Sequence, residues 1–245
     1  MENQTPDSPV LYEVRESAAI LTLNRPARRN AISQKLLVHL YDGLDRANAD
    51  PGVRAIVVTG AGDTFCSGLD LALLSTDNLM DPKGDGTDLL DVVARLTKPL
   101  IGAVNGHAIT GGFELALNCD FLIASENASF ADTHAKVGIH PGWGMTQLLR
   151  QAVGVRMARQ MSLTCKFIGA GDALRAGLVN EVVARERLMP RVLEICRDIA
   201  ATNPEMAATV RNVIRAGSAL PFGEAMALEK RGFHGFLRKA GVFKS

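Results

Sequence analysis

Apolar and polar residues alternate near the start of the chain with the period of two that is typical of β-strands. Residues 12–15 and 18–23 follow this pattern, and the break near Glu16 and Ser17 indicates a tight turn between them. The chain is therefore expected to begin its folded part with a β-hairpin.

Strands and helices are expected to alternate from there to about residue 184. Ser33 is a helix N-cap, because its hydroxyl can accept a hydrogen bond from a free N–H of the first turn. The apolar runs predict strands at 53–59, 99–104, 119–125 and 179–183, and helical spacing predicts helices at 34–48, 88–96, from 112, from about 146, at 155–163 and at 170–177. This alternation predicts an α/β fold.

Only helical patterns follow residue 185, at 187–201, 204–216 and 222–237. We therefore expect an α/β core over 1–185 and a C-terminal helical region over 186–245. Helices that extend from a core need a surface to cover their apolar faces. The last 60 or so residues are thus expected to contact another subunit.

Composition narrows the functional classes. The net charge is +1 and charged residues make up 22% of the chain, so no overall electrostatic attraction to nucleic acid or a membrane surface is expected. Residues 1–10 lack the basic and apolar blocks of a signal peptide, and no apolar run reaches transmembrane length. The four cysteines form no CxxC pair, which argues against a zinc site and favours reduced thiols in a cytoplasmic protein.

The segment 105–117 is the strongest candidate for chemistry. An apolar strand leads to Gly111 and Gly112, and a helical stretch then carries Glu114 in its first turn. Glycines at a helix entry let a ligand approach the backbone, and the first N–H groups of the helix have no internal partner. Such a site can hold an oxygen that becomes negative during a reaction. The alternative is that the two glycines only pack a helix tightly and that Glu114 is a solvated acid.

A second junction, at which a strand leads into a glycine-containing loop, follows the strand 53–59, where the chain reads Phe65-Cys66-Ser67-Gly68-Leu69-Asp70. With it, the chain resembles the crotonase, or enoyl-CoA hydratase/isomerase, superfamily over roughly residues 10–185. The resemblance is carried by Asn24-Arg25-Pro26, Asn30-Ala31, Phe65 to Leu71, Asn105-Gly106, Gly111 to Ala116, Cys119-Asp120 and Gly138 to Gly142, in the order and spacing of the family.

This resemblance implies a spiral of repeated ββα units, C-terminal helices used in trimer contacts, and trimers often paired into hexamers. It implies an acyl-CoA thioester as substrate, with CoA as part of the substrate and no separate cofactor or metal. The N–H groups of Leu69 and Gly111 fall at the positions of the oxyanion hole, and Glu114 falls at the first acid/base glutamate. The implied activity is that of an enoyl-CoA hydratase-type lyase that works through a stabilised enolate.

His134 stands where the second glutamate of the hydratases is expected. It could be the second acid/base group, since imidazole titrates near neutrality. Alternatively Glu114 could act alone, as in an isomerase or another one-base reaction, or the protein could bind acyl-CoA with little turnover. His134 could also be a hydrogen-bonded structural histidine, and Asp132 could orient it or face solvent.

The expected substrate contacts are less specific. Arg28 is a candidate for the CoA phosphates or a solvated surface residue. By the resemblance, the path of the adenine and pantetheine is lined by backbone near Cys66, Gly68 and Leu71. Trp143 follows Pro141 and Gly142 and could wall the acyl pocket or lie in the core. Cys66 is expected to pack rather than to act as a nucleophile.

Overall fold

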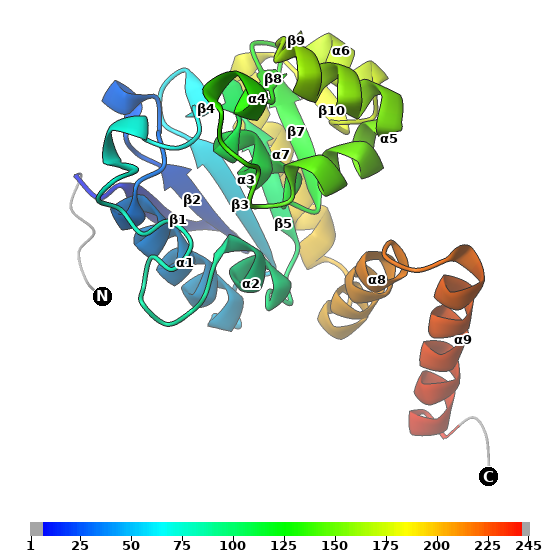
Figure 1. Ribbon diagram of the computed structural model, residues 1–245. Coiled ribbons are helices and arrows are strands. Elements are labelled where there is room, and N and C mark those ends of the chain that lie inside the picture. Colours follow the sequence, from blue (N-terminus) through cyan, green and yellow to red (C-terminus); the bar gives the residue numbers. More distant parts are fainter. Residues whose placement is uncertain (1–6, 242–245) are drawn as a thin grey trace. The chain divides into compact units, whose positions relative to one another are not determined.

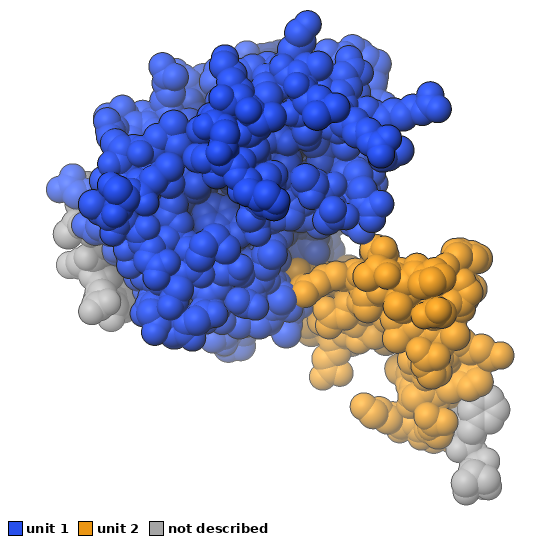
Figure 2. Space-filling view, viewed as in Figure 1, with its two compact units in different colours: residues 1–200 blue, residues 201–245 orange. Residues whose placement is uncertain are grey.

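The computed structural model describes residues 7–241. The chain divides into two compact units, residues 1–200 and 201–245, which are coloured separately in Figure 2. The helix α7 (Leu188–Ala200), which the sequence analysis assigns to the C-terminal region, belongs to the first unit. Its strongly amphipathic pattern explains this, because its apolar side packs against a sheet.

The first unit is built on a six-stranded sheet in the order β1-β2-β3-β5-β7-β10 (Figure 1). β1 and β2 form the expected antiparallel hairpin, in which Arg15 pairs with Ala18, and every later neighbour in the sheet is parallel. The strands are β1 (Val10–Arg15), β2 (Ala18–Leu23), β3 (Ala55–Gly60), β5 (Leu100–Val104), β7 (Phe121–Ser125) and β10 (Glu181–Val183).

A second sheet of four short strands lies beside the first in the order β4-β6-β8-β9. The strands are β4 (Thr64–Cys66), β6 (His107–Ile109), β8 (Ser129–Ala131) and β9 (Ile168–Gly169). The sequence pattern did not predict them, because two or three residues are too few to show a period. Three times the chain passes from the first sheet to the second and then into a helix, which confirms the expected spiral of ββα units.

Helices cover the sheets and set the spacing between them. α1 begins after Ser33, whose hydroxyl accepts a hydrogen bond from the Leu36 N–H at 3.2 Å, and α2 begins with a capping box between Asp88 and Asp91. Their bounds are α1 (Gln34–Ala49), α2 (Leu89–Ala94), α3 (Gly111–Leu117), α4 (His134–Val137), α5 (Met145–Thr164) and α6 (Ala170–Arg175). The one-turn helix α4 was not predicted, since it is too short for a helical period.

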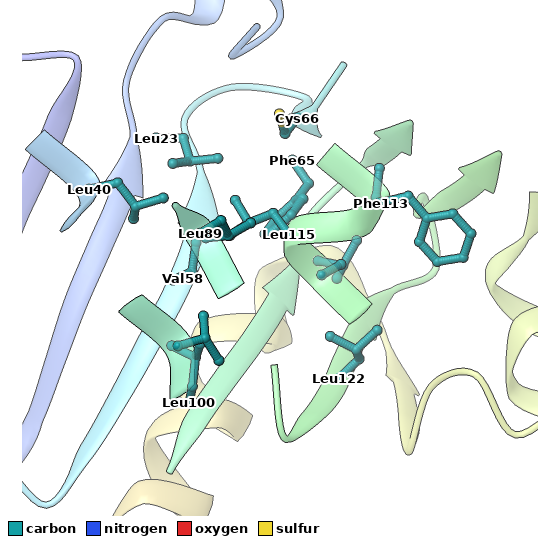
Figure 3. Packing of buried hydrophobic residues seen from close by; sticks show 14 of the residues in the cluster. Leu23, Leu40, Val58, Phe65, Cys66, Leu89, Leu100, Phe113, Leu115 and Leu122 are labelled. Atoms are coloured by element: carbon teal, nitrogen blue, oxygen red, sulfur yellow. The ribbon is translucent and has the colours of Figure 1, made fainter. Parts of the chain in front are cut away.

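Alternate residues of the parallel strands enter two different cores. Ile56 and Val58 of β3 join a large cluster with α1, α2 and α3, and Val57 joins a smaller one with α7 on the opposite face. Figure 3 shows part of the large cluster, to which Val58 of β3, Leu89 of α2 and Leu115 of α3 all belong. Burial of both faces explains why these strands read as continuous apolar runs.

The second unit contains α8 (Pro204–Gly217) and α9 (Phe222–Lys239), which contact each other. Both helices expose large apolar side chains, among them Met206, Val210 and Ile214 on α8 and Phe222 and Phe233 on α9. No helix in the described residues combines the length and the apolar character needed to cross a membrane.

Candidate active site

Glu114 lies one turn into α3 and is almost completely buried, with 2% of its surface exposed. Its Oε1 atom accepts hydrogen bonds from the backbone N–H groups of Trp143 at 2.8 Å and Met145 at 3.2 Å. The alternative of a solvated first-turn acid is therefore wrong. Two N–H donors hold the Oε1 atom in place, and neither of them contacts the Oε2 atom, which can therefore exchange a proton.

Gly112 explains how α3 brings Glu114 to this position. A Cβ atom at residue 112 would lie 2.2 Å from the carbonyl oxygen of Cys66, which is closer than any real contact. Only glycine lets α3 pack directly on the backbone of β4. The tight helix packing that the Gly-Gly pair suggested is thus present, and it serves to place the helix that carries the acid.

His134, at the start of α4, faces Glu114 from the other side. Its Nε2 atom lies 3.6 Å from Oε2 of Glu114, and both side chains are buried. The Oδ1 atom of Asp132 accepts two hydrogen bonds from His134, from Nδ1–H at 2.7 Å and from the backbone N–H at 3.1 Å. Asp132 is 2% exposed, so it orients His134 and does not face solvent.

The charges of this cluster shift its pKa values. Burial alone would lower the pKa of His134, but the hydrogen bond to Asp132 and the carboxylate of Glu114 outweigh burial and raise it to about 9. Burial alone would likewise raise the pKa of Asp132, yet hydrogen bonds from His134 and from the Ser162 side chain hold it below its ordinary value. The surroundings of His134 therefore favour the protonated form of its ring.

The backbone around Leu69 forms one side of the expected oxyanion site. Leu69 makes an isolated parallel bridge with Ile32, in which the Ile32 N–H donates to the Gly68 carbonyl and the Asp70 N–H donates to the Ile32 carbonyl, both at 2.8 Å. In such a pairing the N–H of the middle residue points away from the partner segment. The Leu69 N–H therefore points away from Ile32.

Gly111 approaches from the adjacent junction between β6 and α3. A Cβ atom on Gly68 would lie 3.4 Å from the nitrogen of Gly111, and a Cβ atom on Gly111 would lie 3.3 Å from the Leu69 side chain. In the described part of the chain, neither the Leu69 nor the Gly111 N–H donates a hydrogen bond to another protein group. The two junctions that the sequence analysis compared thus meet, each with a free backbone donor.

Asp70 ties the arginine-rich loop to this backbone. Its buried carboxylate accepts a hydrogen bond from Arg25 at 3.0 Å and lies 3.4 Å from the guanidinium of Arg28. The Arg28 side chain is 57% exposed, so most of its donors remain open to solvent. The cluster of basic residues in the sequence indicates Arg28 but not its buried partner Asp70, because only the packing of the two loops brings them together.

The remaining candidates differ in exposure. Cys66 is fully buried on β4 and burial raises the pKa of its thiol to about 12, which suits packing and not a nucleophile. Gly68 is buried with φ +91°, Leu71 is exposed, and Pro141 is partly exposed. Trp143 is a core residue, and its backbone N–H, not its ring, contacts Glu114.

The arrangement combines two functions that one reaction can use. A buried carboxyl group and a buried imidazole 3.6 Å apart can act as an acid/base pair, and two backbone N–H groups without a protein partner can stabilise a developing oxyanion. Among the described residues, no group of three or more His, Cys, Asp or Glu side chains is arranged to hold a metal ion. The groups present are suited to proton transfer and to binding of an oxyanion.

Comparisons with known proteins show the family to which the chain belongs. The profile of the family described as Enoyl-CoA hydratase/isomerase matches residues 13–245. The peroxisomal protein of Arabidopsis thaliana named "Probable enoyl-CoA hydratase 1" is 38% identical over 96% of this chain and 89% of its own length. The crotonyl-CoA hydratase of Syntrophomonas wolfei is 36% identical over 91% of this chain and 88% of its own.

Solved structures show the same fold. An enoyl-CoA hydratase from Mycobacterium smegmatis superimposes with a TM-score of 0.77 at 42% identity, over 94% of this chain and 99% of that one. One from Bacillus anthracis gives a TM-score of 0.85 at 30% identity, over 94% and 91% of the two chains. The chain is an enzyme that belongs to the enoyl-CoA hydratase/isomerase family, the crotonase superfamily.

Proposed function

We propose that this enzyme is a lyase that adds water across the double bond of a 2-enoyl-CoA thioester. The observation that carries the proposal is the buried pair of Glu114 and His134, whose Oε2 and Nε2 atoms lie 3.6 Å apart beside two free backbone donors. Together these groups match what hydration requires: a base for the water, an acid for the α-carbon and a site for the enolate oxygen.

The oxyanion is stabilised by the N–H groups of Leu69 and Gly111. When hydroxide adds to the β-carbon, the electron pair of the double bond moves onto the thioester oxygen. Two fixed N–H donors favour this enolate over the ground state, and loss of one such donor typically lowers kcat by about 10² to 10³. Because both donors are backbone groups, the Leu69 side chain is free to vary.

The protons balance over one turnover. Glu114 takes a proton from water as the hydroxide bonds to the β-carbon, and His134 delivers its Nε2 proton to the α-carbon as the enolate collapses. Glu114 is then protonated and His134 neutral, and transfer of one proton between the two restores both. Asp132 keeps the His134 ring oriented and stabilises its charged form.

The CoA portion would bind along the loops that lead to the oxyanion site. Arg28 offers an exposed guanidinium to the phosphates, although its contact with Asp70 weakens the local positive charge. The backbone near Cys66, Gly68 and Leu71 would line the path of the pantetheine, and Pro141 would border the acyl group, whereas Trp143 lies in the core.

The test is a direct assay of the purified chain. Hydration of crotonyl-CoA is followed by the fall in ultraviolet absorbance of the conjugated thioester, and a 3-enoyl-CoA is assayed in parallel for isomerisation. We expect hydration in the wild-type chain and a fall in kcat of about 10² to 10⁴ in Glu114→Gln. The exposed Glu126→Gln variant is the matched control and should keep its activity.

Other outcomes identify the alternatives. Turnover of the 3-enoyl-CoA alone would replace hydration with isomerisation through Glu114 as a single base. In the other alternative, butyryl-CoA binds tightly in calorimetry while neither substrate is turned over. If that binding were also unchanged in Glu114→Gln, the protein would be a non-catalytic acyl-CoA-binding protein.

We also propose that the enzyme works in the cytoplasm and assembles as a homotrimer or a hexamer of paired trimers. The exposed apolar faces of α8 and α9 support this assembly.

A further inference from the structure

Thr110 has a backbone conformation that its side chain disfavours. It is the N-cap residue of α3, with φ 52° and ψ −115°. Of the five non-glycine residues with positive φ in the described chain, Thr110 is the only β-branched one. Such a conformation is an outlier for a branched side chain and persists only where the surroundings hold it.

Four contacts hold Thr110 in place. Its N–H donates to the Ala131 carbonyl at 2.9 Å, and its carbonyl accepts from the Glu114 N–H at 2.8 Å. Its hydroxyl is hydrogen-bonded to the Thr133 hydroxyl and also accepts from the Thr133 N–H at 3.3 Å. A substitution at residue 110 can remove both side-chain contacts, whereas one at residue 133 can remove only the contact between the two hydroxyls.

The conformation of Thr110 sets the direction of the next N–H. In a trans peptide the C=O and N–H bonds point in opposite directions. The carbonyl of Thr110 points along α3 to the Glu114 N–H, so the N–H of Gly111 points out of the helix end. Rotation about ψ of Thr110 would turn this donor away and would also loosen the first helical bond to Glu114.

We propose that the hydroxyl pair of Thr110 and Thr133 is a positioning device that aims the Gly111 N–H at the substrate oxygen. This inference rests on the proposed function, in which Gly111 is an oxyanion donor. Since Thr133 directly precedes His134, the same pair links the oxyanion site to the segment that carries the acid. The proposal gives neither threonine a contact with the reacting atoms, so both act as positioning residues.

A glycine at residue 110 provides the decisive comparison. Glycine adopts a positive φ without strain and does not need the hydroxyl pair, whereas valine keeps the branched shape and loses the hydroxyl. We expect Thr110→Val to lower kcat by about 10- to 100-fold with KM changed less than about threefold. Thr110→Ser should stay within about threefold of the wild type, and Thr110→Gly should retain more activity than Thr110→Val.

Thr133→Val tests whether the effect runs through Thr110. In the wild-type background it should lower kcat about tenfold, and in the Thr110→Gly background less than about twofold, because no pair is left to break. An equal loss in both backgrounds would mean that Thr133 acts directly on His134 and would overturn the proposal. Wild-type kcat in Thr110→Val would also overturn it, and circular dichroism establishes that each variant is folded.

A binding assay separates this inference from the proposed function. Acetoacetyl-CoA ionises to an enolate, and the ultraviolet absorbance of that enolate reports how well the site stabilises the oxygen without any turnover. If the wild-type chain binds the enolate but hydrates nothing, the proposed function fails. The positioning role of Thr110 and Thr133 would still be supported by enolate binding that is about tenfold weaker in Thr110→Val. Equal enolate binding in Thr110→Val and the wild type, or no enolate binding in the wild type, would overturn that role.

Discussion

At the scale of single residues, the cluster around His134 is defined by which groups surround its ring. Asp132 contacts Nδ1 and Glu114 faces Nε2, and these are the two charged groups that raise the pKa of the imidazole to about 9. A group whose pKa is higher in the folded than in the unfolded chain binds its proton more tightly when folded. Its contribution to stability is therefore complete below its ordinary pKa of 6.5 and is lost as the pH rises through about 9.

The activity should depend on the protonation of His134. If His134 donates a proton, kcat stays high below about pH 9 and falls above it. Asp132→Asn keeps an oxygen that can accept from the ring but removes the charge, so the pKa of His134 should fall toward 6.5 and the alkaline limb should move to lower pH. The measurements are a pH–rate profile from about pH 6 to pH 10 and NMR titration of the ring.

The exposed Asp172→Asn on α6 is the control and should leave the alkaline limb where it is. An unchanged limb in Asp132→Asn, with an unchanged ring titration, would show that Asp132 does not stabilise the charged imidazole. A shifted ring titration with an unchanged rate profile would instead show that His134 is a structural partner of Glu114 and takes no part in proton transfer.

At the scale of elements, the position of Glu114 depends on how closely α3 lies on β4. Gly112→Ala would bring a methyl group to 2.2 Å from a backbone oxygen and 2.7 Å from the Cβ atom of Cys66, so the helix must move outward. Overpacking of this kind costs about 1–3 kcal/mol. We expect a lower midpoint of thermal unfolding and a lower kcat, since Glu114 moves with its helix.

Gly171→Ala in α6 is the matched control, because its Cβ atom would meet only the far end of the Arg175 side chain at 3.6 Å. It should be neutral or stabilise the chain by up to about 1 kcal/mol, as alanine favours a helix over glycine. Equal unfolding midpoints for Gly112→Ala and the wild type would show that α3 can shift without cost and that glycine is not required there.

The same element scale explains what the sequence could predict. Long runs such as those of β3 and α1 carry enough residues to show a period, and they were predicted to within a few residues. The fold, and the expectation that the Leu69 and Gly111 segments meet, rest on short sequence motifs. Such motifs identify positions in the chain without showing any periodic pattern. The strands of the second sheet and the strain at Thr110 depend on contacts between distant segments, and nothing local in the sequence encodes them. The sequence leaves open whether Asp132 orients His134 or faces solvent, because its burial is set by the packing around it.

At the scale of the whole molecule, both helices of the second unit expose large apolar side chains. Met206, Val210 and Ile214 repeat every four residues along α8 and are 42%, 50% and 65% exposed. A continuous apolar stripe of this kind on a helix is typical of an interface. The proposed trimer or hexamer would cover it with another copy of the chain.

A charge at Ile214, the most exposed residue of this stripe, tests the assembly. The wild-type chain should run in multi-angle light scattering at three or six times its 26.2 kDa mass. Ile214→Glu would bury an unpaired carboxylate in the interface at a cost of about 3–5 kcal/mol, which weakens association by 10² or more and should produce smaller species. Asn212→Glu adds the same charge at an exposed polar position of the same helix and should keep the wild-type mass. A wild-type chain that runs as a monomer, or an Ile214→Glu variant with an unchanged mass, would show that the apolar stripe of α8 is not a subunit interface.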